Sequence, residues 1–196
     1  MGLSLRPATT GDRRQVYEWL ARSDATAQMM GPPDFRDHPV PDYREFCADY
    51  DDEAFAADGN FRIFIMVAEG REIGAIHYWV RDRIAEVDLW IGNREDWGRG
   101  YGSSAIRLVA GMLERQDVAG MMIIRPSARN CRAIAAYRKA GFVPHDPARH
   151  ELPGWCLTEG LDYADAVVLV WVLATEMNSV EEPVNVAGDG DCRHHG

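Results

Sequence analysis

A glycine-rich segment, residues 96–103 (DWGRGYGS), joins a strand-like sequence to a helix-like one and limits the folds open to this chain. Glycines let the backbone turn sharply and bring several N–H groups close to a ligand. The start of the following helix adds free N–H groups and the positive end of the helix dipole. The segment therefore predicts a phosphate-binding turn, beside which Arg99 could add a positive charge.

Two other phosphate-binding folds do not fit this segment. A dinucleotide-binding fold needs GxGxxG after the first strand of a parallel unit, with an acidic residue about 20 residues later. Here three strand-like segments come first, and the acidic position falls near residues 116–117, inside or just after the helix. A P-loop needs Gly-Lys-Ser/Thr, but Lys139 is the only lysine of the chain. Both folds are excluded.

The hydrophobic pattern predicts one α/β domain with a mixed sheet. Three strands precede the turn as an antiparallel meander, and a proline-rich loop is expected at 29–41. Strands are expected at residues 3–6, 61–68, 73–80, 84–91, 121–124 and 167–173. Helices are expected after Thr9 and at 42–50, 101–115 and 130–140.

Composition restricts the partners and the location of the protein. A net charge of −10 argues against a nucleic-acid partner. The longest apolar run, 166–174, is about half the ~20 residues of a membrane span, so no membrane partner is expected. No basic stretch followed by an apolar one opens the chain, which favours a cytoplasmic protein. Its cysteines are predicted to be free thiols, and Cys192 with His194 and His195 is too weak a pattern for a metal site.

A second pattern follows the glycine-rich helix at Asn130-Cys131-Arg132-Ala133-Ile134-Ala135-Ala136-Tyr137-Arg138-Lys139-Ala140-Gly141-Phe142. It resembles the second signature of the GNAT N-acetyltransferases: Asn, then Ala-Ile, Tyr and Gly-Phe. Residues 97–102 match the first signature, Gln/Arg-x-x-Gly-x-Gly/Ala, with Trp97 at its first position. This Trp-Gly-x-Gly-Tyr-Gly form is similar to the ribosomal-protein N-terminal acetyltransferase branch. The resemblance covers about residues 3–175 and implies a GNAT domain over 1–176, followed by a flexible tail over 177–196.

The resemblance implies a fold and a cosubstrate. The GNAT fold has a central mixed, mostly antiparallel sheet flanked by helices, and it binds acetyl-CoA without a metal. The N–H groups of Gly98, Arg99, Gly100, Tyr101, Gly102 and Ser103 are then expected to hold the pyrophosphate, with Trp97 beside them. The strand edge at Ile91 and Gly92 would pair with the pantetheine amides like an added strand. Asn130 would hydrogen-bond the pantetheine arm or the acetyl group.

The resemblance also gives Tyr137 a catalytic role. Tyr137 follows Asn130 by about two helical turns, so the two share a helix face. Its hydroxyl would protonate the departing CoA thiolate as a general acid. Without the signature, a core aromatic residue would be the simpler interpretation.

Attack by an amine also needs a proton acceptor. Glu86, Asp88 and Trp90 alternate along the 84–91 strand and so share one face, with Val87, Leu89 and Ile91 on the core face. Glu86 or Asp88 is therefore predicted to act as base or to bind the substrate. Solvated carboxylates or pairs with Arg81 and Arg83 are the alternative, and His77 on the neighbouring strand is a weaker candidate base.

The acceptor is expected to be a small cationic primary amine, of aminoglycoside or polyamine type. Residues 34–58 hold nine acidic residues against two arginines, which suits a cationic substrate or a solvated face. Residues 125–130 (RPSARN) are similar to the Asp-Pro-Ser-x-x-Asn run of aminoglycoside 6′-N-acetyltransferases, but Arg125 replaces the Asp that contacts the drug there. The alternatives are a protein N-terminal acetyltransferase and a non-catalytic acyl-CoA-binding module. The resemblance also allows a homodimer.

Overall fold

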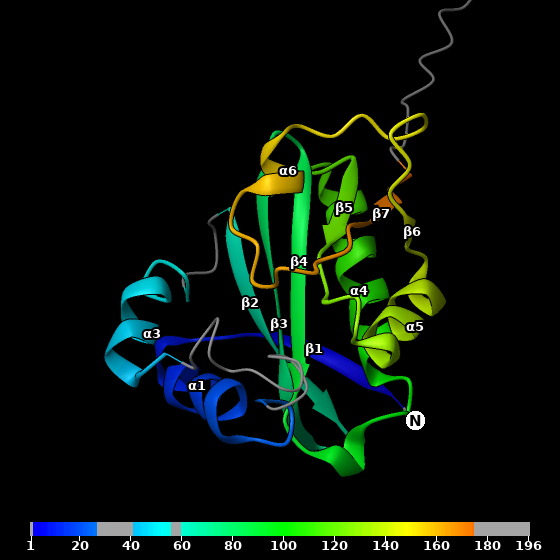
Figure 1. The fold of residues 1–196 in the computed structure, drawn as a ribbon. Coiled ribbons are helices and arrows are strands. Elements are labelled where there is room, and N and C mark those ends of the chain that lie inside the picture. Colours follow the sequence, from blue (N-terminus) through cyan, green and yellow to red (C-terminus); the bar gives the residue numbers. More distant parts are fainter. Residues whose placement is uncertain (1, 27–40, 56–59, 175–196) are drawn as a thin grey trace, which may run out of the picture.

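The computed structural model describes residues 2–26, 41–55 and 60–174, and its centre is a seven-stranded sheet (Figure 1). The strands are β1 (Leu3–Pro7), β2 (Phe61–Ala68), β3 (Arg71–Arg81), β4 (Ile84–Ile91), β5 (Met121–Ile124), β6 (Val143–Pro144) and β7 (Leu169–Val172). Their order in the sheet is β1-β2-β3-β4-β5-β7-β6. Every pair is antiparallel except β4 and β5.

The parallel pair between β4 and β5 is short. Its register joins Ile84 to Met121 and ends where Glu86 faces Ile123. From Val87 onward, β4 has no partner strand on that side within the described chain. The two strands therefore leave an opening in the middle of the sheet, and this opening positions the site described below.

Helices cover both faces of the sheet (Figure 1). Helices α1 (Arg13–Arg22) and α3 (Tyr43–Asp49) pack one face through a core that includes Val16 and Phe46. Helices α4 (Tyr101–Gln116) and α5 (Cys131–Ala140) pack the other face. A short helix, α6 (Trp155–Thr158), lies near the ends of β4 and β5, and 3-10 turns stand at Thr10–Asp12 and Arg94–Asp96. The alternating pattern of β4 explains this layering, since Val87 faces α4 while Trp90 faces α1.

The predicted mixed, mostly antiparallel sheet with flanking helices is confirmed, including the three-strand meander. Two elements were not predicted, β6 and α6, because segments of two and four residues are too short to show a period. In the described part of the chain no helix is both long and apolar enough to cross a bilayer. The proline-rich loop, apart from Pro41, and the C-terminal tail with Cys192, His194 and His195 lie outside the described residues.

Several acids of the 34–58 segment are used locally. Asp42 caps α3 by accepting the N–H groups of Arg44 and Glu45, and Glu45 completes the capping box. Asp51 accepts two N–H groups of the following turn, and Asp52 pairs with Arg13. These bonds weaken the interpretation of the segment as an acidic rim for the substrate.

Candidate active site

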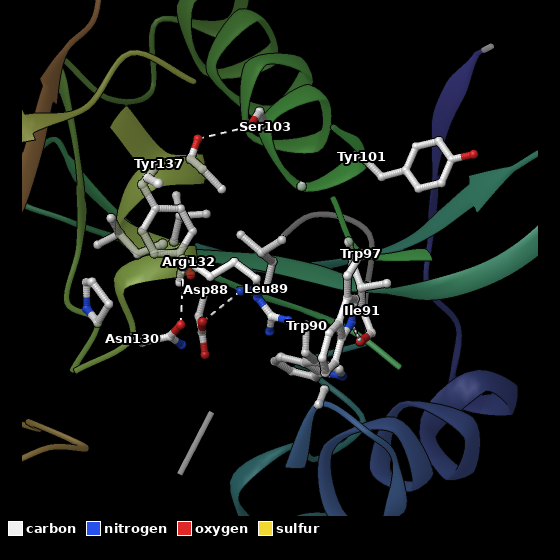
Figure 2. A pocket seen from close by; sticks show the side chains of 18 of the residues that line it. Asp88, Leu89, Trp90, Ile91, Trp97, Tyr101, Ser103, Asn130, Arg132 and Tyr137 are labelled. Carbon is white, nitrogen blue, oxygen red and sulfur yellow. Dashed lines mark hydrogen bonds between the residues drawn. The ribbon is translucent and has the colours of Figure 1, made fainter. Parts of the chain in front are cut away.

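A cleft of about 350 Å³ opens where β4 and β5 separate. Its walls come from β4, the glycine-rich turn, the first turns of α4 and α5, and the end of β5 (Figure 2). All three predicted catalytic residues line it, as do eight of the ten predicted cofactor residues: Ile91, Trp97, Gly98, Gly100, Tyr101, Gly102, Ser103 and Asn130. Gly92 and Arg99 do not.

The glycine-rich turn has the backbone that a phosphate site needs. Gly98 and Gly100 have φ of 74° and 82°, in the left-handed region that side chains avoid. Within the described structure, no group accepts a hydrogen bond from the backbone N–H groups of residues 98–103. Six N–H donors at the start of a 16-residue helix therefore remain available to an anion.

Trp97 links this turn to the strand edge and to α5. Its Nε1–H donates to the carbonyl oxygen of Ile91 at 2.9 Å. The Arg132 guanidinium stacks on the indole, 3.7 Å from the ring centroid, and Arg94 lies 5.6 Å from the same ring. Burial, and then the charge of Arg94, lower the pKa of Arg132. Neither arginine pairs with a carboxylate in the described chain, so two cations stand next to the turn without a counter-ion.

The predicted strand edge is only partly available to a ligand. The N–H of Gly92 donates to Ile73 on β3, and its Cα packs against Trp19, so Gly92 belongs to the sheet and not to the cleft. The Ile91 carbonyl already accepts the Trp97 indole. Leu89, which sequence analysis placed only in the core, gives its N–H to the Asp88 carboxylate at 2.7 Å.

Three signature residues use their side chains for structure. Arg99 lies 4.0 Å from Glu69 and does not line the cleft, so a contact of its charge with a ligand stays a prediction. The Tyr101 hydroxyl donates to the same Glu69, and its ring turns away from the other labelled residues (Figure 2). The buried Ser103 hydroxyl donates to the Ala136 carbonyl and joins α4 to α5.

Helix α5 brings Asn130 and Tyr137 to the cleft together, as the two-turn spacing predicts. Asn130 is the N-cap, and its Oδ1 accepts the Ala133 N–H at 3.2 Å. Tyr137 is 8% exposed, and no described residue hydrogen-bonds to its hydroxyl. Burial, and then the charge of Asp88, raise the Tyr137 pKa well above its usual value, so the phenol is protonated at neutral pH.

Asp88 faces the cleft without a cationic partner among the described residues. Burial raises its pKa to about 8, with a further contribution from Asp162 and a small opposing one from the Leu89 N–H. His77 is its cross-strand neighbour but does not line the cleft. It packs among Tyr50, Phe61 and Trp90, and burial lowers its pKa to about 4. His77 is therefore neutral and a weak base at pH 7.

Glu86 is already paired. Both of its carboxylate oxygens accept from Arg125, at 2.7 and 2.9 Å. Burial raises the Glu86 pKa, while the Arg125 guanidinium acts in the opposite direction. The alternative pairing with Arg81 or Arg83 does not occur, because those arginines pair with Asp82 and Glu159 or with Asp117. Of the two carboxylates, Asp88 is thus the one without a cationic partner among the described residues.

The cleft wall also contains residues that were not predicted, among them Arg132, Asp162 and Tyr163. Arg132 stood inside the second signature without an assigned role. Asp162 and Tyr163 lie in an irregular segment with no periodic pattern, and no local signal could have placed them. Among the described residues, no three His, Cys, Asp or Glu side chains are grouped closely enough to hold a metal ion.

Comparison with known proteins finds proteins of similar sequence and fold. Aminoglycoside N(6′)-acetyltransferase type 1 of Klebsiella pneumoniae is 24% identical over 156 residues, which cover 71% of this chain and 73% of that protein. The fold matches aminoglycoside acetyltransferase AAC(6′)-Ib in complex with coenzyme A and kanamycin, with a TM-score of 0.64, 20% identity, and coverage of 87% and 95% of the two chains. It also matches Vibrio cholerae spermidine N-acetyltransferase in complex with CoA and spermine, with a TM-score of 0.62, 18% identity and the same coverage.

These solved structures, at such low identity, establish the fold. The family is established separately, by a model described as "Acetyltransferase (GNAT) domain", which matches residues 3–143. That range includes the cleft wall from Glu86 to Tyr137 and both signatures. The chain belongs to the GNAT acetyltransferase family.

Proposed function

We propose that the protein transfers an acetyl group from acetyl-CoA directly to the primary amine of a small cationic acceptor. One observation carries the proposal: a single cleft contains the glycine-rich turn with its available N–H groups, the Asp88 carboxylate without a cationic partner among the described residues and the protonated Tyr137. The N–H groups of residues 98–103, with Arg132 beside them, suit the pyrophosphate of CoA. Acetyl-CoA supplies the activated acetyl thioester.

The residues of the cleft can then move the two protons that the reaction requires. The Asp88 carboxylate accepts a proton from the incoming ammonium, directly or through water, and leaves a neutral amine. The amine nitrogen bonds to the acetyl carbon as the carbon–sulfur bond breaks, and Tyr137 gives its phenolic proton to the departing sulfur. The second proton, which the nitrogen loses as it becomes an amide, returns to the Tyr137 oxygen directly or through water and restores the phenol. A base with a pKa near the working pH is the most effective one, and the pKa of Asp88 is about 8.

A small cationic acceptor is supported by the charge of the cleft and by the relatives. Asp88 has no cationic partner among the described residues, and Asp162 also lines the cleft. An ammonium group would be attracted to these acids in their ionised form. The similar proteins include enzymes named for aminoglycosides and for spermidine. The preference gains little from four other acids, because three bond to nearby N–H groups and Asp52 pairs with Arg13: Asp42, Glu45, Asp51 and Asp52.

A thiol-release assay with acetyl-CoA tests the proposal across kanamycin, spermidine, spermine and short peptides with free N-termini. We expect turnover with kanamycin or a polyamine. Turnover with peptides alone would replace the proposal with protein N-terminal acetylation. No turnover with any amine, together with tight CoA binding in calorimetry, would favour a non-catalytic acyl-CoA-binding module.

A further inference from the structure

Arg125 lies just after β5, at the point where β5 separates from β4. Its side chain is 9% exposed and makes four hydrogen bonds. Two reach the Glu86 carboxylate on β4, and the other two reach the carbonyl oxygens of Glu159 and Gly160. One buried guanidinium thus joins β4, β5 and a third segment that is far away in sequence.

That third segment forms part of the cleft wall. Gly160, Asp162 and Tyr163 line the cleft, and burial followed by the charge of Asp88 raises the Tyr163 pKa. Gly160 has φ of 56°, so the segment turns sharply where Arg125 holds it. Asp162 and Tyr163 follow this turn and lie near enough to Asp88 for charge interactions with its carboxylate.

The other end of the segment is held by the same run of the chain. Ser127 and Arg129 both donate to the Asp165 carboxylate, and the Ala128 N–H donates to the Asp165 carbonyl. Residues 125–129 therefore hold the segment at both ends, and Asp162 and Tyr163 lie between the two attachments. Arg125 is the more buried of the two arginines, with 9% of its side chain exposed against 49% for Arg129.

We propose that Arg125 is a positioning residue for the acceptor: it fixes residues 159–163 to the diverging strands, so that Asp162 and Tyr163 form the acceptor wall opposite Asp88. Arg125 would not contact the acceptor itself, because its hydrogen bonds are directed to Glu86 and to the two carbonyls. The role in acceptor binding rests on the proposed function. The attachment of residues 159–163 by Arg125 does not depend on it.

The test compares Arg125→Gln with Arg83→Gln in the full chain. Arg83 is a matched control, because it also binds a carboxylate and a carbonyl, those of Asp117, but outside the cleft. Amide hydrogen exchange is measured over residues 157–166. We expect about tenfold faster exchange there in Arg125→Gln, since lost contacts favour local opening, with α4 and α5 unchanged. Arg83→Gln should match the wild type.

The second measurement is steady-state kinetics with kanamycin and with spermine. In Arg125→Gln the KM for the acceptor should rise about tenfold, while the KM for acetyl-CoA and kcat change less than about threefold. Arg125→Lys keeps the charge but loses the planar fork, and it should fall between wild type and Arg125→Gln in both measurements. Arg125→Lys also tests the proposal if Arg125→Gln does not fold.

Wild-type exchange over 157–166 in a folded Arg125 variant would overturn the proposal. So would faster exchange with an unchanged acceptor KM, or an equal loss of acetyl-CoA binding. If the wild-type protein accepts neither amine, the proposed function fails, and the exchange result alone decides whether Arg125 holds the segment.

Discussion

At the scale of single residues, Tyr137 reaches the cleft from α5, and its hydroxyl has no hydrogen-bonded partner in the described chain. Replacing it with Phe removes only the proton donor. We predict that Tyr137→Phe lowers kcat by about a hundredfold or more, the usual effect of losing a general acid, with little change in CoA affinity. Stopped assays and calorimetry measure the two quantities. Tyr78→Phe, at another buried tyrosine, is the control, and a parallel loss of affinity in Tyr137→Phe would indicate a structural role instead.

Asp88 gives a prediction about pH. Its carboxyl is protonated below a pKa of about 8 and can accept a proton only above it. We therefore expect kcat/KM to rise with pH until about 8 and then level off. In Asp88→Asn the rate should be low and this rise absent. A variant that keeps the rise would assign it to the substrate amine or to another group.

At the scale of elements, the glycine-rich turn depends on its left-handed residues. Gly100 has φ of 82°, so Gly100→Ala is expected to strain the turn by about 1–2 kcal/mol. A Cβ there meets no atom within 4 Å, and the cost is therefore conformational. We predict a CoA Kd about tenfold higher by calorimetry. Gly120→Ala, also in open space, should leave the Kd unchanged, and a wild-type Kd in Gly100→Ala would show that the turn tolerates a side chain.

The first turn of α5 adds a charge to the same site. Arg132 stacks on Trp97 and has no carboxylate partner among the described residues. We predict that Arg132→Ala weakens CoA binding about tenfold, in the range of a lost charged hydrogen bond. Arg138→Ala, an exposed position on the same helix outside the cleft, is the matched control. If the two variants bind CoA with equal affinity, Arg132 packs against the Trp97 indole but does not contribute to CoA binding.

At the scale of the whole molecule, the partly buried His77 and Asp88 make stability depend on pH in opposite directions. The pKa of His77 is lowered to about 4, so its contribution is lost as pH falls from about 6.5 towards 4. The pKa of Asp88 is raised to about 8, so the folded state holds a proton that the unfolded state releases above about pH 4. Its effect therefore lowers stability as pH rises towards 8.

Above about pH 6.5 only the Asp88 effect of the two remains. We predict that the free energy of unfolding falls between pH 6.5 and 8 in the wild type, and falls less in Asp88→Asn. Urea titrations at several pH values measure both slopes. If the free energy of unfolding falls equally with pH in the wild type and in Asp88→Asn, Asp88 does not titrate between pH 6.5 and 8.

Local spacing in the sequence predicted a large part of the site. The glycines gave the turn, the two-turn spacing placed Asn130 and Tyr137 on one face of α5, and strand alternation placed Glu86 and Asp88 together. These predictions succeeded because helix and strand periods are set by backbone geometry within a few residues. The same patterns gave the meander and the four main helices, and the resemblance to the GNAT family placed helices beside the sheet.

Only the tertiary structure decided which carboxylate is paired with an arginine and which segment completes the cleft wall. Glu86 and Arg125 are 39 positions apart, and their pairing leaves Asp88 as the carboxylate without a cation in the described chain. The segment with Asp162 and Tyr163 reaches the cleft through bonds from Arg125 and Arg129. These contacts depend on where β4 and β5 separate, a property of the whole sheet that no local period records.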